Sequence, residues 1–255
     1  MIDFTNKVAL VTGGSRGIGA ATVAAFCRTG AHVIVGYTTH TEAAREVAEG
    51  AGPDRCHPVR ADLAEPGAAH RLWGDALAWR GRIDILVNNA GVYEPAPLDA
   101  SDEQWYSVWQ KTLQVNLTAT ADLCREAIRH WLGHGSGGAI VNVASRAAFR
   151  GDGPDHWAYA ASKGGMISLT KTLARAYSAR GIFTYGVAPG WVETDMAQAS
   201  FAEDPASRER TAREIPIGTI APASDIAHAI CFLASGLATH ATGQTLDLNG
   251  ASYVR

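Results

Sequence analysis

Short runs of apolar residues alternate along the chain with longer stretches in which apolar positions recur every three or four residues. The short runs are rich in valine, isoleucine and leucine, which is typical of strands buried on both faces of a parallel sheet. We expect such strands at residues 7–11, 31–35, 56–61, 83–87, 139–144, 182–187 and 244–248. The longer stretches predict helices at residues 20–29, 41–49 (with Thr41 as N-cap), 65–80, 102–132 (one long helix or two adjacent ones), 157–179 and 224–235.

Strands that alternate with helices predict βαβ units and a doubly wound parallel sheet of the Rossmann type. Helices on both faces would make this an α/β fold of three layers, α/β/α. We expect residues 1–255 to form a single domain, because α/β folds of this length commonly form one unit. We interpret the charged segment 193–215 as a substrate lid, with an ordinary solvated helical excursion as the alternative.

Composition excludes several classes of function. The chain has 22 lysines and arginines against 25 aspartates and glutamates, so it lacks the positive excess that a nucleic-acid partner requires. No apolar run approaches the ~18 residues of a membrane span, and the N-terminus does not resemble a secretory signal. We therefore expect a cytoplasmic protein. The cysteines show no C-x-x-C spacing and are expected to be buried free thiols without a metal: Cys27, Cys56, Cys124 and Cys231.

A glycine-rich turn, TGGSRGIG at residues 12–19, follows the first expected strand and opens the first helix. Glycines permit a tight turn and a close approach of the backbone to a pyrophosphate. The N-terminus of the following helix offers free N–H groups to an anion. The spacing is G-x-x-x-G-x-G instead of the commoner G-x-G-x-x-G. The strand–turn–helix setting nevertheless predicts a dinucleotide site.

Four motifs, in this order, resemble those of the short-chain dehydrogenase/reductase family. They are the glycine-rich turn, Asn88-Asn89-Ala90-Gly91 after the fourth strand, Tyr159-Ala160-Ala161-Ser162-Lys163, and Pro189-Gly190-Trp191-Val192-Glu193-Thr194. They span nearly the whole chain, and the pattern is most similar to β-ketoacyl carrier protein reductases and related carbonyl reductases. The resemblance implies a Rossmann-type fold, a nicotinamide cofactor and a homo-oligomer, either a tetramer or a dimer.

The resemblance also implies which residues bind the cofactor. They come from the glycine-rich turn, from the ends of later strands and from the other motifs: Gly13, Ser15, Arg16, Gly17, Ile18, Gly19, Tyr37, Thr38, Thr39, Asp62, Leu63, Asn89, Ala90, Gly91, Tyr159, Lys163, Pro189, Gly190, Val192 and Thr194. Asp62 has a structural alternative as a loop N-cap. Asn88 is expected to tie neighbouring strands together.

The end of the second strand favours NADP(H) over NAD(H). NAD sites of this type usually place an acidic residue there for the ribose 2′-hydroxyl. Here Tyr37 takes that place, and no carboxylate follows before Glu42. Arg16 is positioned to pair with a 2′-phosphate, and Thr38 and Thr39 add hydroxyl donors. The alternative is a solvated Arg16 and an enzyme that accepts both cofactors.

Tyr159 and Lys163 are four residues apart on an expected helix, which places their Cβ atoms roughly 5–6 Å apart on one face. The ammonium is expected to lower the tyrosine pKa from ~10 by about 1–3 pH units. By resemblance, Ser145 polarises the substrate oxygen and Asn116 supports a water-mediated proton relay.

These residues predict an oxidoreductase that moves a hydride between NADP(H) and a small-molecule carbonyl or secondary alcohol, with Tyr159 as general acid/base. The alternatives are an NAD-linked alcohol or sugar dehydrogenase of the same family and a dinucleotide-sensing regulator without turnover. For the substrate pocket we expect apolar walls from Phe149, Trp157, Trp191 and Met196, with His156 and Arg150 near a polar or anionic group. Arg146 is interpreted as a cofactor-side or loop residue.

Overall fold

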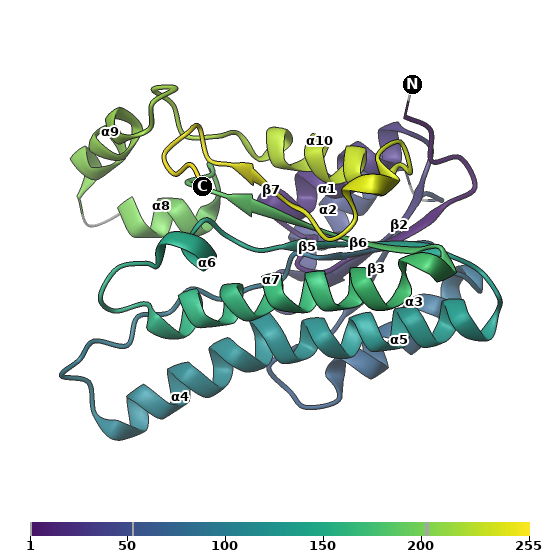
Figure 1. The fold of residues 1–255 in the computed structure, drawn as a ribbon, viewed down its shortest axis with the longest axis horizontal. Helices are drawn as coiled ribbons and strands as arrows, with labels where there is room; N and C mark the ends of the chain where they lie inside the picture. The colour runs from purple at the N-terminus through teal and green to yellow at the C-terminus, as the bar shows by residue number, and fades with distance from the viewer. Residues whose placement is uncertain (1, 53, 202–203) are drawn as a thin grey trace.

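The computed structural model describes residues 2–52, 54–201 and 204–255 (Figure 1). In these residues, seven strands form one parallel sheet in the order β3-β2-β1-β4-β5-β6-β7. The strands are β1 (Val8–Val11), β2 (His32–Tyr37), β3 (Cys56–Arg60), β4 (Ile85–Asn88), β5 (Gly138–Val143), β6 (Ile182–Pro189) and β7 (Thr245–Leu248). The order reverses at β1, which pairs with β2 on one side and β4 on the other.

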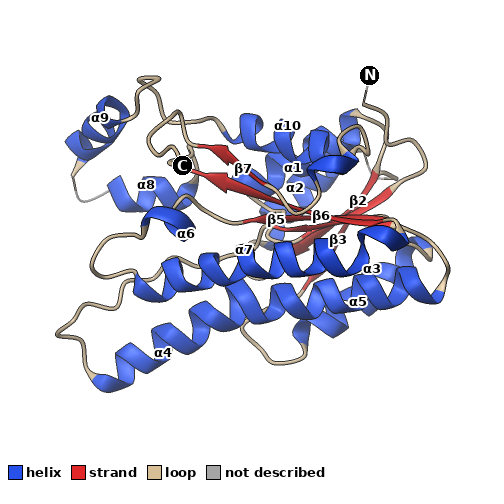
Figure 2. Ribbon diagram, viewed as in Figure 1, coloured by secondary structure: helices blue, strands red, loops and turns tan. Residues whose placement is uncertain are grey.

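Helices cover both faces of the sheet (Figure 2). One face carries α1 (Gly17–Arg28), α2 (Thr41–Ala51) and α10 (Ala223–Ala234), and the other carries α3 (Ala68–Arg80), α4 (Asp102–Leu113), α5 (Ala119–Gly133) and α7 (Trp157–Tyr177). The shorter helices α6 (Ala147–Arg150), α8 (Asp195–Phe201) and α9 (Pro205–Glu214) lie at the end of the molecule toward which the strand arrows point. A π-helix, η1 (Gln114–Thr118), joins α4 to α5, and two 3₁₀ turns are η2 (Ser178–Arg180) and η3 (Thr239–Ala241).

The fold class expected from the sequence is confirmed: a doubly wound parallel sheet in three α/β/α layers. Each face of the sheet has its own apolar core, because alternate strand residues point to opposite faces. Val11, Val87 and Val141 pack toward α1 and α10, whereas Leu10 and Leu86 pack toward α3 and α5. As expected, Asn88 ties neighbouring strands together: its Nδ2 on β4 donates to Asn142 Oδ1 on β5 at 2.9 Å.

Several element boundaries differ from the expected ones for local reasons. Helix α1 begins at Gly17, three residues early, because the glycine-rich segment itself forms the first turn and Ala20 N donates to Arg16 O at 3.1 Å. Thr41 is not an N-cap: it is the first helical residue of α2, and His40 occupies the cap without a side-chain bond. Helix α3 begins three residues late, because the chain first makes a turn in which Ala68 N donates to Glu65 O.

All four cysteines are buried free thiols, as expected. Cys27 and Cys56 are far apart in sequence, yet their Sγ atoms lie 3.2 Å apart in the core beneath α1. The hydrogen bond between them lowers the pKa of Cys27 and raises that of Cys56. Over the described residues, every helix is too short or too polar to traverse a lipid bilayer.

Candidate functional site

A cavity of about 550 Å³ opens at the carboxyl ends of the strands. Its walls come from the loops after β1, β2, β4, β5 and β6, together with the start of α7 and the segment leading into α8. This is the crevice that a doubly wound sheet creates where its strand order reverses, and it is the usual ligand site of such sheets. Two ends can be distinguished: the glycine-rich turn and the end of β2 form one, and Ser145 with the segments around it forms the other.

The glycine-rich turn is held by hydrogen bonds and by the absence of side chains. Asn89 Nδ2 donates to the carbonyl oxygens of Thr12 and Gly13 at 2.9 and 3.0 Å, which fixes the turn to the end of β4. Gly13 has φ of 61°, a left-handed conformation that favours glycine. A Cβ on Gly19 would lie 2.0 Å from Gly13 O, so no other residue fits between the turn and α1.

The N-terminus of α1 faces the cavity, and among the described residues no side chain caps its N–H groups. Its cap residue, Arg16, makes no side-chain capping bond, and no acidic residue lies in the first turn. Free N–H groups and the positive end of the helix dipole are therefore available to an anionic ligand.

At the end of β2, the residues Tyr37, Thr38 and Thr39 line the cavity without a carboxylate among them. The Thr38 hydroxyl donates to Ala61 O at 2.9 Å, so it is already engaged. Arg16 Nη1 lies 3.5 Å from Asp195 Oδ2 of α8, with both side chains about half exposed. Exposed pairs of this kind contribute only ~0–1 kcal/mol, so Arg16 can exchange this partner at little cost.

Ser145, Tyr159 and Lys163 meet at the other end. Tyr159 hydrogen bonds with the Ser145 side chain, and Lys163 Nζ lies 5.7 Å from the centre of the tyrosine ring. The Lys163 ammonium is buried and donates to Val143 O at 2.8 Å. Ser145 lies two residues after the end of β5, and Tyr159 and Lys163 lie on α7, so these two elements bring the three residues together on one wall of the cavity.

The pKa values of this group differ from the sequence expectation. Loss of hydration raises the pKa of Tyr159 to about 12, despite the opposing hydrogen bond with Ser145, and the negative charge of Asp152 adds to the rise. Burial lowers the pKa of Lys163 to about 8. The expected net lowering of the Tyr159 pKa is therefore wrong, because the cost of burying a phenolate outweighs the stabilisation that a nearby ammonium offers.

Asn116 lies behind the cavity wall, fully buried in the π-helix. Its Oδ1 accepts from Val92 N at 2.8 Å, and its Nδ2 donates to Val92 O and Ser162 Oγ. A Cβ placed on Gly91 would lie 3.4 Å from Asn116 Oδ1 and 3.5 Å from Lys163 Nζ, so both side chains approach the same glycine.

The structure brings nearly all the expected site residues to one cavity. Of the expected catalytic and cofactor-binding residues, only Gly19 and Asn116 do not line the cavity. The residues that line it are Gly13, Ser15, Arg16, Gly17, Ile18, Tyr37, Thr38, Thr39, Asp62, Leu63, Asn89, Ala90, Gly91, Ser145, Tyr159, Lys163, Pro189, Gly190, Val192 and Thr194. Asp62 also caps its own loop, since Oδ1 accepts from Ala64 N at 3.0 Å.

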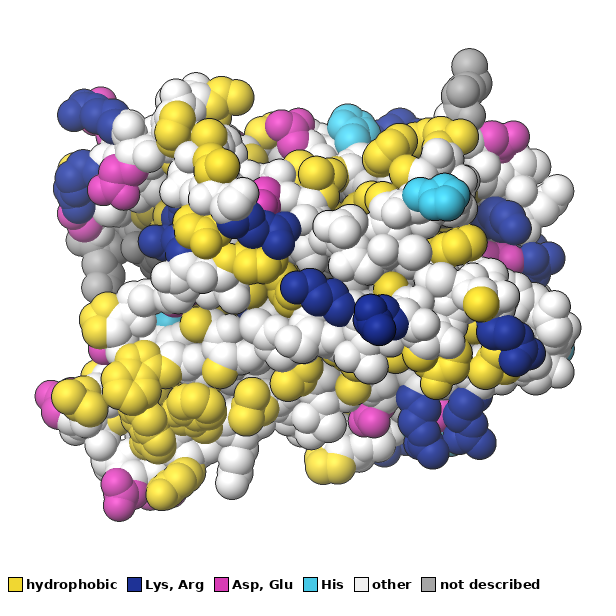
Figure 3. Space-filling model, viewed as in Figure 1, with side chains coloured by type: hydrophobic (Ala, Val, Ile, Leu, Met, Phe, Trp, Pro, Cys, Tyr) yellow, Lys and Arg dark blue, Asp and Glu magenta, His cyan; other side chains and the backbone are white. Residues whose placement is uncertain are grey.

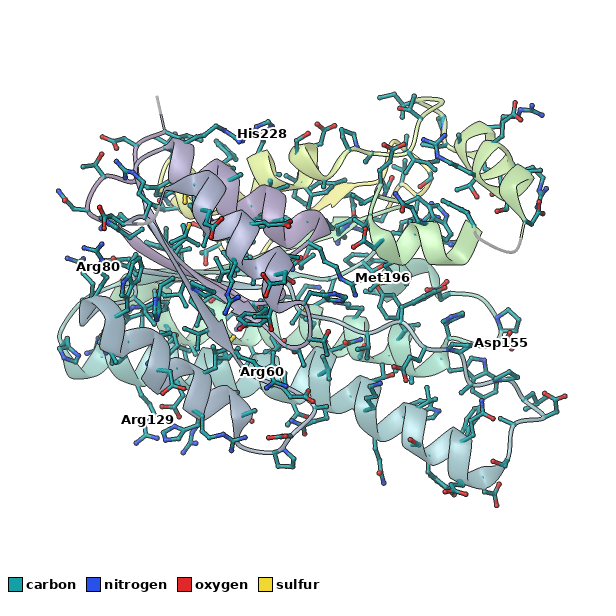
Figure 4. The ribbon with its side chains drawn as sticks, turned by 180° about the vertical axis from the view of Figure 1, so that it is seen from behind. Arg60, Arg80, Arg129, Asp155, Met196 and His228 are labelled. Atoms are coloured by element: carbon teal, nitrogen blue, oxygen red, sulfur yellow. The ribbon has the colours of Figure 1, made fainter. Side chains whose placement is uncertain are left out.

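The expected apolar substrate walls are only half right. Trp191 and Met196 line the cavity, and Figure 4 shows Met196 on α8. Trp157 instead packs edge-on against Trp105, with ring centres 5.4 Å apart, and lies outside the cavity. Phe149 also lies outside it, beneath the Arg255 guanidinium at 3.8 Å.

Sequence reasoning missed Tyr93, which lines the cavity beside the catalytic candidates. Its ring stacks on His156 at 3.8 Å and meets the Tyr159 ring edge-on at 4.8 Å. Its hydroxyl donates to Asp152 Oδ1 at 3.5 Å. The available signal was its position, two residues after the Asn88-Asn89-Ala90-Gly91 motif.

The fold and the cavity define a Rossmann-type α/β protein with its site at the switch point of the sheet. A family model described as "Enoyl-(Acyl carrier protein) reductase" matches residues 13–250. The chain belongs to the short-chain dehydrogenase/reductase family, a family of oxidoreductase enzymes.

Individual relatives resemble the chain over nearly its whole length. It is 38% identical to 3beta-hydroxysteroid dehydrogenase 1 of Eggerthella lenta, over 97% of this chain and 94% of the relative. It is 34% identical to the 3-oxoacyl-[acyl-carrier-protein] reductase of Escherichia coli, over 99% and 100%. A solved structure from Beutenbergia cavernae, provisionally assigned as an NAD(P)-dependent gluconate 5-dehydrogenase and containing NADP at low occupancy, superposes with a TM-score of 0.87 at 38% identity, over 98% of both chains.

Proposed function

We propose that this protein is an NADP(H)-dependent oxidoreductase that transfers a hydride between the nicotinamide and a carbonyl or secondary alcohol. The observation that carries the proposal is the meeting of Ser145, Tyr159 and Lys163 on one wall of a cavity whose far end is the glycine-rich turn. The relatives act on a steroid, an oxoacyl group and gluconate, according to their names, so they support the reaction class and leave the substrate open.

The residues present fit a dinucleotide. Bare backbone at Gly13 and Gly17, which line the cavity, and the uncapped N-terminus of α1 suit a pyrophosphate. Arg16 and Thr39 would hold the 2′-phosphate of NADP(H), since Thr38 already donates its hydroxyl elsewhere. The solved relative with bound NADP favours the same cofactor. When bound, the nicotinamide supplies or accepts the hydride.

The proton chemistry belongs to the chain itself. Tyr159 has a pKa raised to about 12, so at neutral pH it carries the proton that a reduced carbonyl oxygen must receive. Ser145 hydrogen bonds at the same place and would stabilise charge on that oxygen. After transfer, the Lys163 ammonium beside the ring stabilises the phenolate. Oxidation of an alcohol would require Tyr159 to ionise first, so these groups favour reduction.

We assign Asn116 to the support of a proton relay behind Lys163. Its amide holds the segment after β4 in place through Val92 and holds the start of α7 through Ser162. Both Asn116 and Lys163 approach Gly91, which is consistent with a shared route for protons away from the cavity.

Residues 193–215 are proposed as the substrate lid. Within this segment Thr194, Asp195, Met196 and Ala197 line the cavity. The pair between Arg16 and Asp195 joins this segment to the glycine-rich turn by one weak exposed contact. Residues 202–203 of the segment lie outside the described residues.

We propose that the protein forms a homo-oligomer, a tetramer or a dimer. Apolar side chains gather over α4 on the face seen in Figure 3. Large apolar side chains are exposed on the helices there: Tyr106 of α4 is 62% exposed, and Trp157 at the start of α7 is 49% exposed. Multi-angle light scattering measures the assembly; a monomer at micromolar concentration would contradict this proposal.

The test of the proposed activity is a screen of ketones, ketoesters and quinones in which the loss of NADPH absorbance is followed. We expect at least one class of ketone to be reduced, with kcat/KM higher for NADPH than for NADH. Binding of NADPH without turnover of any compound would support the regulatory alternative, and a strong preference for NADH would favour the NAD-linked dehydrogenase.

A further inference from the structure

Two arginines face the cavity beside the proposed catalytic serine. Arg146 directly follows Ser145, and Arg150 ends the single turn of α6, where its N–H donates to Arg146 O at 3.1 Å. Both line the cavity. Side chains four residues apart on a helix share one face, so the two guanidinium groups project from neighbouring positions of the same wall.

These two cations have no carboxylate partner in the described part of the chain, where neither lies within 4.0 Å of an acidic side chain. The Arg146 guanidinium is partly buried, and Ser252 Oγ is its one hydrogen-bond partner among the residues that the structure describes. Loss of hydration, and then the positive charge of Arg150, lower its pKa. The two positive charges of Arg146 and Arg150 repel each other at this spacing. An anion bound by both guanidinium groups would offset that repulsion.

The acidic groups whose charge reaches Arg146 form no ion pair with it among the described residues. Asp152 lines the same cavity and attracts Arg146 from a distance, and its Oδ1 accepts from the Gly153 N–H and the Tyr93 hydroxyl. Glu214 at the end of α9 acts on Arg146 only through its long-range charge. Ser252 is neutral and fixes one edge of the guanidinium, which leaves further N–H donors for a ligand.

We propose that the substrate carries a carboxylate, bound by Arg146 and Arg150, in addition to the carbonyl held at Ser145 and Tyr159. The planar fork of a guanidinium matches a carboxylate in a bidentate manner. The inference rests on the proposed function, and it names the substrate class of that site: oxo acids and the corresponding hydroxy acids.

The position of the arginines favours the substrate over the cofactor as the source of the anion. The uncapped α1 N-terminus and Arg16 already provide for phosphate groups at the far end of the cavity. Arg146 instead directly follows Ser145, which in the proposed reaction binds the oxygen of the substrate. We therefore assign an anion bound at Arg146 to the same molecule as that oxygen.

The test compares oxo acids with their methyl esters, which match them in shape and lack the charge. The pairs are 4-oxopentanoate, 4-oxocyclohexanecarboxylate and phenylglyoxylate, each with its ester, and kcat and KM are measured with NADPH. We expect the acid of at least one pair to exceed its ester in kcat/KM by about tenfold or more, mainly through KM. Arg146→Met and Arg150→Met should each lower the acid-to-ester ratio of kcat/KM by about tenfold, which is the readout of the carboxylate contact.

A control is Arg129→Met, because Arg129 lies on α5, does not line the cavity and is well separated from Met196 in Figure 4. It should leave acid and ester rates as in the wild type. Equal turnover of acids and esters in every pair would overturn the inference. So would a rise in KM for NADPH in Arg146→Met with the acid-to-ester ratio intact, which would assign the arginine to a cofactor phosphate.

Calorimetric titration of cyclohexanecarboxylate into the NADPH-bound protein separates this inference from the proposed reaction. Binding that weakens at least tenfold in Arg146→Met, in a protein that reduces no ketone, would overturn the reaction and keep the carboxylate site. If the wild-type protein reduced neutral ketones and bound no carboxylate, the carboxylate site would be overturned and the proposed reaction would stand.

Discussion

The two ends of the cavity are built from different materials. The end at the glycine-rich turn consists of backbone, of glycines such as Gly13 and Gly19, and of an uncapped helix N-terminus. The end at Ser145 consists of ionisable and aromatic side chains, with Tyr93 and Arg146 among them. The first end imposes shape, and the second sets charge and proton affinity. A substitution should therefore affect cofactor binding at one end and turnover at the other.

The largest expected effect is at the second end. Tyr159→Phe removes the proton donor and should lower kcat for reduction by about 10²–10⁴-fold, the usual contribution of general acid catalysis. NADPH affinity, measured by fluorescence titration, should stay within about twofold. Tyr106→Phe, at an exposed position of α4, removes a hydroxyl in the same way and should have no effect. Equal rates for Tyr159→Phe and the wild type would refute the proposed role.

A change at the first end should act on shape. Gly19→Ala places a methyl group 2.0 Å from Gly13 O and should cost about 1–3 kcal/mol or more of folding free energy, together with most of the NADPH affinity. Gly74→Ala in α3 is the matched control, because its Cβ would meet nothing within 4 Å. That control should stabilise the protein by about 0.4–1 kcal/mol. Thermal melting with and without NADPH measures both, and similar melting curves for the two variants would contradict the steric argument.

Arg16 sharpens the comparison, since it is a charged side chain at the end made mainly of backbone. Arg16→Ala should raise KM for NADPH by about tenfold or more and leave KM for NADH nearly unchanged, the loss expected for a charge-assisted hydrogen bond to the 2′-phosphate. Arg45→Ala on α2, which removes an exposed ion pair with Glu42, is the control. If Arg16→Ala raised KM for NADPH and for NADH by the same factor, the proposed contact with the 2′-phosphate would be wrong.

The smallest effect is a pH dependence that arises only at the side-chain end. Lys163 loses its proton near pH 8, whereas Tyr159 keeps its own until about pH 12. Between pH 7 and 9 the charged fraction of Lys163 falls about tenfold, so kcat/KM for reduction should fall by about the same factor, because this ratio reports groups of the free enzyme. A profile that stays flat to pH 10 would remove Lys163 from the proton chemistry.

Stability should respond to the same groups with opposite signs. The folded-state pKa of Lys163 lies below its usual value, so the unfolded chain binds more protons between about pH 8 and ~10.4 and stability rises with pH there. The folded-state pKa of Tyr159 lies above its usual value, so the same reasoning makes stability fall above ~10. Urea unfolding of Lys163→Met should lack the first change.

The sequence predicts the end built of backbone almost completely. The turn at residues 12–19 is contiguous, and its glycines carry the steric requirement in the residue type itself, so the site follows from local order. Fold class follows likewise from the alternation of apolar strands and amphipathic helices. The start of α1 at Gly17 was missed because a glycine-rich segment is not expected to form a helical turn. Here the hydrogen bond from Ala20 N to Arg16 O closes that first turn.

The side-chain end was predicted only in part. Tyr159 and Lys163 share a helix face, so their meeting follows from spacing. The contacts of Tyr93 with Tyr159 and Asp152 join two loops and the start of α7, and no local pattern in the sequence encodes their proximity. The direction of the Tyr159 pKa was missed for the same reason, since burial depends on everything packed around the ring. Trp157 looked like a pocket wall but packs on Trp105 of α4, which lies far away in the sequence.

The π-helix between α4 and α5 has a consequence for any attempt to alter the length of this region. Ala119 N–H reaches back to Gln114 O, one residue further than in an α-helix, so the segment accommodates one extra residue without a break. Deletion of a single residue here would restore a continuous α-helix and leave α5 nearly in phase, whereas deletion of one residue within α5 would rotate everything beyond that point by about 100°. The second deletion would turn the face of α5 that packs on α3 toward solvent, while the first would chiefly change the local turn that aims the amide of Asn116 at Val92. Insertions and deletions in this helix are therefore restricted by its phase, much as a reading frame restricts them in a gene.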